Sequence, residues 1–320
     1  MTTETSTVRR VDVVTVTLNP AIDQTVTIPE FAAGKVNRVQ HVRSDPGGKG
    51  VNVAHILADY GHTVAVTGFL GAENAAPFEA LFARKQIADH FVRIAGQTRV
   101  GIKIADPVLR QTTDINFPGQ APTPSDVARL YRSLDAVHGR WAVLGGSLPP
   151  SVDATIYRDL VTALKASGSS VALDTSGAAL RYALEAAPEV IKPNIHELED
   201  LVGAQLTTPG AIVEAAHSLI DRGIRLVAIS MGSAGACFVD NTTVVMARPP
   251  AVEVRSTVGA GDAMVAGIVA GQLRNMPLPT CARLATAFSL DAISHIGSGL
   301  SSPGAVEAGM QQVTVEELSG

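Results

Sequence analysis

The residues best suited to chemistry form the run Ser256-Thr-Val-Gly-Ala-Gly-Asp262. We interpret it as a glycine turn that opens a helix, with a carboxylate in the first turn. Such a turn exposes backbone N–H groups that have no intrahelical partner, and the helix dipole strengthens their attraction for anions. Gly259 and Gly261 would let the backbone approach a ligand closely. The run therefore predicts an anion site with a carboxylate beside it.

Two interpretations of Asp262 stay open from these residues alone. A carboxylate is out of place at an anion site unless it acts on a hydroxyl that arrives there, which suggests phosphoryl transfer to an alcohol. Asp is also common near helix N-termini, where it caps the backbone. The run by itself does not choose between a catalytic base and a helix cap.

A second glycine turn, Asp45-Pro-Gly-Gly-Lys-Gly-Val-Asn-Val-Ala54, is expected to open a helix that runs to about Tyr60. It is not a Walker A loop, because Arg43 replaces the first Gly and Gly50 replaces the Ser/Thr that holds magnesium. Consecutive glycines suit a close backbone approach to a polar ligand, with Lys49 and Asn52 as side-chain contacts. The alternative is a purely structural turn.

Asp23 follows the first predicted strand, Val11 to Leu18, after the turn residues Asn19-Pro20. Ligands of open α/β sheets bind outside the carboxyl ends of the strands, so Asp23 is well placed to hold a substrate hydroxyl. The alternative is an Asp that only forms the turn.

From Thr63 onward the pattern alternates between strand and helix, which predicts an α/β protein with a mostly parallel sheet covered by helices on both faces. A hairpin is expected within Phe238 to Met246, and two long helices are expected to close the domain. The predicted strands are Val64 to Phe69, Trp141 to Leu144, Val171 to Asp174, Val190 to Ile191 and Leu226 to Ser230. The predicted helices are Ala75 to Lys85, one starting near Pro124, Ala154 to Ala166, His196 to Val202, Ala211 to Asp221, Asp262 to Leu273 and Leu278 to His295.

Four segments that alternate in polarity predict short antiparallel strands with one solvated face, which would form a small lid beside the main sheet. They are Gln24 to Ile28, Asn37 to Arg43, Thr98 to Ala105 and Gln111 to Phe117. We find no internal repeat or linker. The expected organisation is a single domain over residues 1–320, with the lid strands within about 24–43 and 98–117.

The composition excludes several classes of protein. A net charge of -5 and a pI near 5.9 argue against a nucleic-acid surface, which usually needs a basic face. Cys237 and Cys281 lie far apart, and the eight histidines lack ligand spacing, so no disulfide or metal framework is expected. The polar start, Met1 to Arg10, lacks a signal-peptide core, and no apolar stretch is long enough for a membrane span. These features predict a soluble cytoplasmic protein without nucleic-acid or membrane partners.

Read together, the two glycine turns resemble the paired signatures of the ribokinase-like (PfkB) carbohydrate kinases. Three further motifs stand between them in the order that this family shows: Gly146-Ser-Leu-Pro149, Lys192-Pro-Asn-Ile-His-Glu197 and Ser230-Met-Gly-Ser-Ala-Gly235. The resemblance covers nearly the whole chain. It implies a ribokinase-like fold, in which a mostly parallel sheet flanked by helices carries a small β-lid.

The resemblance also implies a sugar kinase that uses ATP and Mg²⁺. By similarity, Asp262 would be the base that accepts the proton of the substrate hydroxyl, and Gly259, Ala260 and Gly261 would form the anion hole. Asn194 and Glu197 would order magnesium through water. The ATP contacts would be Lys35, Lys192, Asn194, Ser230, Gly232, Gly235 and Thr257, and the sugar contacts Asp23, Gly48, Lys49, Asn52 and Ser147.

Within the family, the chain is similar to the branch that acts on phosphorylated sugars, in which an Arg at the position of Arg99 contacts the phosphate already present. A guanidinium suits that dianion. The implied reaction is ATP-dependent phosphorylation of the C6 hydroxyl of D-fructose 1-phosphate. Tagatose 6-phosphate and fructose 6-phosphate are alternative substrates, and a non-catalytic sugar-phosphate sensor is an alternative function.

Two residues depart from the family pattern. Gly101 stands where close relatives often carry Asn, which puts one sugar contact in doubt. Ser256 replaces the Asp that begins this motif in many ribokinases, as is usual in the phosphosugar branch.

Exposed lid edges could pair between subunits, so a homodimer through the lid is expected.

Overall fold

The computed structural model describes residues 9–109, 111–295, 297 and 299–318. Its central sheet has the strand order β15-β14-β13-β12-β11-β10-β9-β1-β4-β5, with β6 also paired to β4. The strands from β12 to β5 pair in parallel, whereas β13, β14 and β15 are antiparallel. The bounds are β1 Arg9–Thr17, β4 Val64–Gly71, β5 Ala88–Asp89, β6 Val92–Ile94, β9 Val137–Gly145, β10 Ser170–Asp174, β11 Val190–Ile191, β12 Leu226–Ser230, β13 Ala236–Val239, β14 Val244–Arg248 and β15 Thr314–Leu318.

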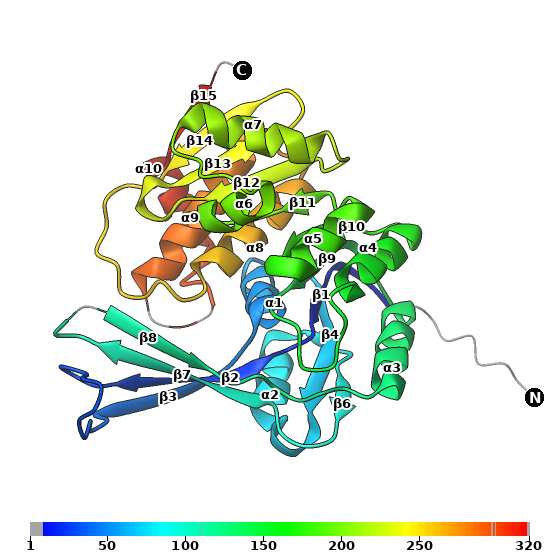
Figure 1. Ribbon diagram of the computed structural model, residues 1–320, viewed down its shortest axis with the longest axis vertical. Helices are drawn as coiled ribbons and strands as arrows, with labels where there is room; N and C mark the ends of the chain where they lie inside the picture. The colour runs from blue at the N-terminus through cyan, green and yellow to red at the C-terminus, as the bar shows by residue number, and fades with distance from the viewer. Residues whose placement is uncertain (1–8, 110, 296, 298, 319–320) are drawn as a thin grey trace, which may run out of the picture.

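Helices cover both faces of this sheet (Figure 1). One face packs against α1 Lys49–Asp59, α2 Ala76–Lys85, α8 Ala260–Leu273, α9 Leu278–Ser294 and α10 Pro303–Gln312. The other packs against α3 Pro124–Asp135, α4 Ile156–Ala166, α5 Gly177–Ala183, α6 Ile195–Val202 and α7 Pro209–Ile220. Successive strand residues point to opposite faces, so Val143 enters the first core and Leu144 the second. The expected α/β architecture is therefore confirmed.

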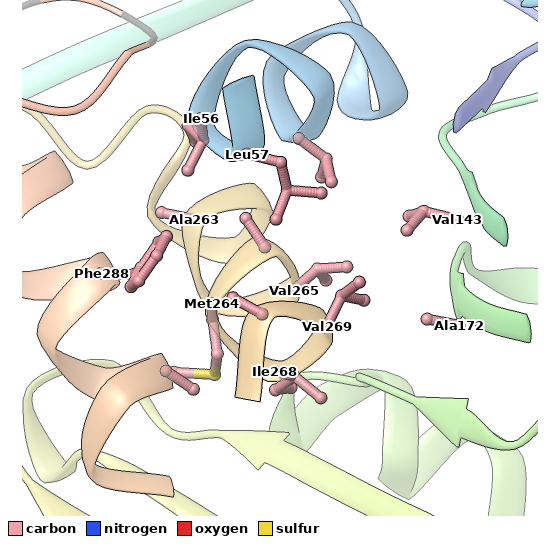
Figure 2. Packing of buried hydrophobic residues seen from close by; sticks show 14 of the residues in the cluster. Ile56, Leu57, Val143, Ala172, Ala263, Met264, Val265, Ile268, Val269 and Phe288 are labelled. Carbon is pink, nitrogen blue, oxygen red and sulfur yellow. The ribbon is translucent and has the colours of Figure 1, made fainter. Parts of the chain in front are cut away.

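Helix α8 lies in the middle of the first core (Figure 2). Its residues from Asp262 to Gly271 are all buried, as expected for a helix that is apolar all round. Leu57 of α1 and Phe288 of α9 pack on it, together with strand residues. A Cβ on Gly267 would lie 2.6 Å from Ala285 Cα, so the small residues let α8 and α9 approach closely. This packing fixes the position of the glycine turn that opens α8.

The lid is a separate four-stranded sheet with the order β3-β2-β7-β8. Its strands are β2 Ala21–Thr27, β3 His41–Gly47, β7 Arg99–Asp106 and β8 Gln111–Asn116. One face carries a small apolar cluster around Val26, Ile28 and Ile104. The alternate residues, which include Asp23 and Lys103, form the polar face. The predicted alternation of polarity is confirmed.

Three details of the predicted fold were wrong. The central pair of the lid, β2 and β7, is parallel, because the two strands come from different parts of the chain and each has its own antiparallel neighbour. The strand expected at Asn37 to Arg43 lies at His41–Gly47. It includes Pro46, which an edge strand tolerates. The last two predicted helices do not close the fold, because α10 and β15 follow, and β15 extends the central sheet beyond β14.

Two further features bear on the composition. Cys237 and Cys281 are both buried free thiols. Among the helices that the structure describes, none is long and apolar enough to cross a bilayer.

Candidate active site

Most of the predicted site residues gather at the edge of the central sheet where the parallel strands end. Asp174 is the last residue of β10, Lys192 follows β11, and Ser230 is the last residue of β12. The glycine turns before α1 and α8 reach the same edge, as the contacts below demonstrate. Because parallel strands all present their carboxyl ends on one side, residues far apart in sequence meet there.

Asp262 is held by α1. Gly259, with φ of 81°, is the N-cap residue of α8, so Asp262 stands in the first turn rather than at the cap. Its Oδ2 accepts a hydrogen bond of 2.7 Å from Asn52 Nδ2. Asn52 and Asp262 are both buried, with 6% and 8% of their surface exposed. The carboxylate is therefore fixed from another helix, with Oδ1 left for a second partner.

The surroundings of Asp262 raise its pKa to about 6, and burial is the main cause. The negative charge of Asp174 adds to the rise, whereas Lys49, the Asn52 hydrogen bond and Lys192 oppose it. A carboxyl with a pKa of about 6 is a better proton acceptor than an exposed Asp and is still mostly ionised at neutral pH. This environment suits a general base.

Beside Asp262 lie three charged side chains, Asp174, Lys49 and Lys192, whose mutual contacts the sequence did not reveal. Asp174 Oδ1 accepts a hydrogen bond from Lys49 Nζ at 2.8 Å and lies 3.5 Å from Lys192 Nζ. A Cβ on Gly261 would lie 3.4 Å from Lys192 Nζ, so this ammonium stands at the N-terminus of α8. The predicted Lys49 and Lys192 are thus brought together. Asp174 was missed, although its place at the end of a predicted strand was a usable signal.

Asn194 and Glu197 form a capping box at the start of α6. Asn194 Oδ1 accepts from the Glu197 N–H at 2.9 Å, and the Asn194 N–H donates to Glu197 Oε2 at 2.8 Å. Ser230 pairs with Asn194 in a parallel bridge. Gly232 and Gly235 bound the short turn after β12, where a Cβ on Gly235 would lie 2.1 Å from the Ala247 carbonyl oxygen. The motif therefore has a clear structural role. Burial lowers the pKa of Lys49, whereas the charges of Asp174, Asp262 and Glu197 raise it.

Thr257 lies in the exposed segment just before α8, next to the glycine turn. Lys35 does not join the other residues. It is exposed in the connection between β2 and β3. This connection lies at the end of the lid far from α1 (Figure 1).

The polar face of the lid turns toward α8 and encloses a pocket. Asp23, Lys103, Asn52, Ser256 and Gly259 contribute to its lining. Lys103 Nζ lies 3.8 Å from Asp23 Oδ2, and this ammonium was a second residue missed in the sequence. Burial raises the pKa of Asp23, while Lys103 and Arg99 oppose the rise. The Asp23 carboxylate, a hydrogen-bond acceptor, and the Lys103 ammonium therefore lie opposite the glycine turn of α8.

Asp23 also accounts for the unusual Gly101. The two residues are paired across β2 and β7, and a Cβ at 101 would lie 3.0 Å from Asp23 Oδ1. On the other side, a Cβ at Gly47 would lie 2.6 Å from Asp23 Oδ2. The carboxylate thus sits between two positions without side chains. A larger residue at 101 would require Asp23 to shift. Gly48, with φ of 113°, follows as the N-cap residue of α1.

Arg99 connects the lid to the body of the protein. Its guanidinium donates to the Phe117 and Asn19 carbonyl oxygens at 3.0 and 3.2 Å. Asn19 in turn donates to Ser147 Oγ at 3.1 Å, which links Arg99 indirectly to this predicted sugar contact. Arg99 Nε is buried without a partner among the described residues. The side chain therefore has both a structural role and spare donor capacity.

The comparisons with known proteins identify the family. Residues 11–305 match the model of the pfkB family carbohydrate kinases. The chain belongs to this family. Its similarity to a 1-phosphofructokinase of Rhodobacter capsulatus is 48% identity over 309 residues, which covers 96% of this chain and 98% of the relative. For the 1-phosphofructokinase of Escherichia coli K12 the identity is 38%, with coverage of 96% and 99%.

Solved structures of this kinase family share the fold. Phosphofructokinase-2 of Escherichia coli in complex with fructose-6-phosphate superposes with a TM-score of 0.86 at 28% identity, covering 94% of this chain and 98% of that chain. As a pfkB-type carbohydrate kinase, the chain uses ATP together with a divalent metal ion.

The residues of the site fit a nucleotide and a metal held largely by phosphate. A Cβ on Gly259 would meet no atom within 4 Å, so space lies open at the N-terminus of α8, and Lys192 stands at its edge. Within the described residues, no group of three His, Cys, Asp or Glu side chains gathers as a metal cage. A divalent ion would therefore depend on phosphate oxygens and water, as Mg²⁺ commonly does.

Proposed function

We propose that this kinase transfers the γ-phosphoryl group of ATP to the C6 hydroxyl of D-fructose 1-phosphate, giving fructose 1,6-bisphosphate and ADP. The observation that carries the proposal is the near full-length identity of 48% to a protein named 1-phosphofructokinase. The site supports the same chemistry, because a buried carboxylate with a pKa of about 6 stands at a helix N-terminus that is open to an anion.

In this proposal Asp262 is the base. Its Oδ1 accepts the proton of the C6 hydroxyl while that oxygen forms a bond to the γ-phosphorus and the bond to the ADP oxygen breaks. The N–H groups at Gly259, Ala260 and Gly261 stabilise the charge on the transferring phosphoryl group. A positioned base is worth roughly 10²–10⁴ in rate.

The nucleotide is assigned to the residues on the α6 and β12 side of the site. Lys192 would contact phosphate, and Asn194 and Glu197 would order Mg²⁺ through its waters. The ion would neutralise charge on the phosphates. Lys35 would reach phosphate only if its loop, or the lid of a second subunit, carried it to the site. The remaining nucleotide contacts are assigned to Ser230, Gly232, Gly235 and Thr257.

The sugar phosphate is assigned to the lid and the first glycine turn. Asp23, held beside Lys103, would accept hydrogen bonds from sugar hydroxyls. Arg99 would contact the C1 phosphate through the guanidinium N–H groups that do not donate to Phe117 and Asn19. Gly48, Lys49, Asn52 and Ser147 complete the proposed sugar site.

We also propose that residues 1–320 form one kinase domain and that it dimerises through the lid. The apolar face of the lid supports an interface, because Val42 and Ile115 are 59% and 45% exposed. Their strand partners Val26 and Ile102 belong to its apolar cluster.

A substrate panel tests the proposal directly. We expect the highest kcat/KM with fructose 1-phosphate, compared with fructose 6-phosphate and tagatose 6-phosphate under saturating ATP and Mg²⁺. Preference for a 6-phosphate would contradict the assignment of substrate and leave the kinase family intact. Binding of the sugar phosphate and of an ATP analogue without turnover would favour a sensor instead.

A further inference from the structure

The strongest unassigned feature of the molecule is Asp174. Its side chain is 3% exposed, and one of its oxygens faces two ammonium groups. Asp174 Oδ1 accepts a hydrogen bond from Lys49 Nζ at 2.8 Å and lies 3.5 Å from Lys192 Nζ. The three residues come from three separate elements: β10, the start of α1 and the segment that precedes α6.

The two lysines face different parts of the site. Lys49 follows the glycine turn at Gly48 and starts the helix that carries Asn52, on the side proposed for the sugar. Lys192 lies against Gly261 at the N-terminus of α8, on the side proposed for the nucleotide. Asp174 is the group that contacts both ammonium ions.

The charges of this cluster shift the pKa of Asp174 and of Lys49. Lys192 and Lys49 hold the pKa of Asp174 below its usual range despite its burial, and Asp174 raises the pKa of Lys49. One carboxylate, Asp174, therefore faces two ammonium groups, and the charges of Asp262 and Glu197 also act on Lys49. Each lysine competes with the other for Asp174, and each is also available to an incoming phosphate or hydroxyl.

We infer that Asp174 is a positioning residue that couples binding of the two substrates. When a phosphate group attracts Lys192, Asp174 is left to Lys49 and holds that ammonium in the place where the sugar meets it. The first ligand thereby fixes Lys49 and lowers the cost of ordering it for the second ligand. The coupling is reciprocal, so the sugar must tighten nucleotide binding by the same factor.

This inference rests on the proposed function and is tested by titration calorimetry. The probes are fructose 1-phosphate and the non-hydrolysable nucleotide AMP-PCP with Mg²⁺, each titrated alone and in the presence of the other. In the unmodified protein we expect AMP-PCP to tighten sugar-phosphate binding by about 5-fold or more, which is the lower range of typical coupling. In Asp174→Asn we expect less than about 2-fold. Asp221→Asn, at the exposed C-terminus of α7, is the matched control and should keep the full coupling.

A structural role alone would give a different result. If Asp174→Asn weakened both ligands equally and kept the coupling, Asp174 would only support the fold, and the inference would be wrong. It would also be wrong if coupling persisted while the Mg²⁺ concentration for half-maximal activity rose, since Asp174 would then act on the metal.

A second variant covers the case in which Asp174→Asn does not fold. Lys49→Gln leaves the contact between Asp174 and Lys192 in place and removes the group through which the coupling passes, so it should also abolish the coupling. Retained coupling in Lys49→Gln would overturn the inference. Turnover by the unmodified protein is measured in parallel. Turnover without coupling contradicts only the role of Asp174, whereas absence of both binding and turnover contradicts the proposed function.

Discussion

Asn52 donates a hydrogen bond of 2.7 Å to Asp262, and this bond joins residues 210 positions apart in the sequence. It links the first turn of α8 to the interior of α1, and both side chains are buried. The contact fixes one carboxylate oxygen, and in the proposed reaction the other accepts the proton of the substrate hydroxyl. The following predictions depend on this pair and on the charges around it.

Replacing Asp262 with Asn should lower kcat by about 10² or more and leave nucleotide affinity nearly unchanged, because a base is lost while the anion site remains. Steady-state kinetics with calorimetric measurement of AMP-PCP binding provide the test. A variant with unchanged kcat would show that Asp262 only supports the helix.

The same variant should be more stable than the unmodified protein at pH 7 to 8. The pKa of Asp262 in the folded state, about 6, lies above the value for an unfolded chain, so ionisation opposes folding. The free energy of unfolding therefore falls as pH rises from about 4 to about 6, by about 3 kcal/mol for a shift of about 2 units. An Asn at position 262 does not ionise, so the variant avoids this fall in the free energy of unfolding. Urea unfolding at pH 4.5 and pH 7.5 should show a clearly larger gain at the higher pH, and an equal difference at both would contradict the assigned pKa.

The pH profile of kcat/KM should fall on the acid side near pH 6 as Asp262 is protonated. Sugar phosphates also titrate near this pH, so the fall alone is not diagnostic. Asn52→Ala removes a hydrogen bond that favours the charged form of Asp262, and the acid limb should move to higher pH. The substrate's own titration cannot move between variants. If the acid limb stays at the same pH in Asn52→Ala, the hydrogen bond between Asn52 and Asp262 does not control the ionisation of Asp262.

Arg99→Ala should raise KM for fructose 1-phosphate by about 10-fold or more with a smaller change in kcat, since it removes donors from the proposed phosphate contact. Arg99 also donates to two backbone carbonyl oxygens, so the variant could shift the lid. Arg99→Lys keeps the charge and loses the planar fork, and it should give an intermediate KM. An unchanged KM in both variants would limit Arg99 to its structural role.

Val42→Glu should weaken a dimer formed through the lid, because it places a charge on the apolar face opposite the pocket. Sedimentation equilibrium of the full chain should report a shift toward monomer. Val252→Glu is a matched control at an exposed valine outside the lid. Identical behaviour of both variants and the unmodified protein would argue against this interface.

Much of the fold was predictable because it depends on local patterns. The alternation of apolar strands with helices repeats along the chain, and the glycine turns before α1 and α8 stand where the sequence indicates. The pairing of β2 with β7 was not predictable in this way. Strand direction in a sheet depends on which segments meet, and no local pattern encodes a partner about 80 residues away.

For the site, the sequence by itself was enough to predict the side chains to which we assign the chemistry: the carboxylate at Asp262, the glycines before it and the lysines at 49 and 192. Only the tertiary structure decided their state. Burial in α8 raises the pKa of Asp262, the Asn52 hydrogen bond ties its carboxylate to α1, and Asp174 Oδ1 faces both lysines. Electrostatic interactions depend on distance and solvent exposure, and these are set by the packing of helices and strands that are remote in the chain.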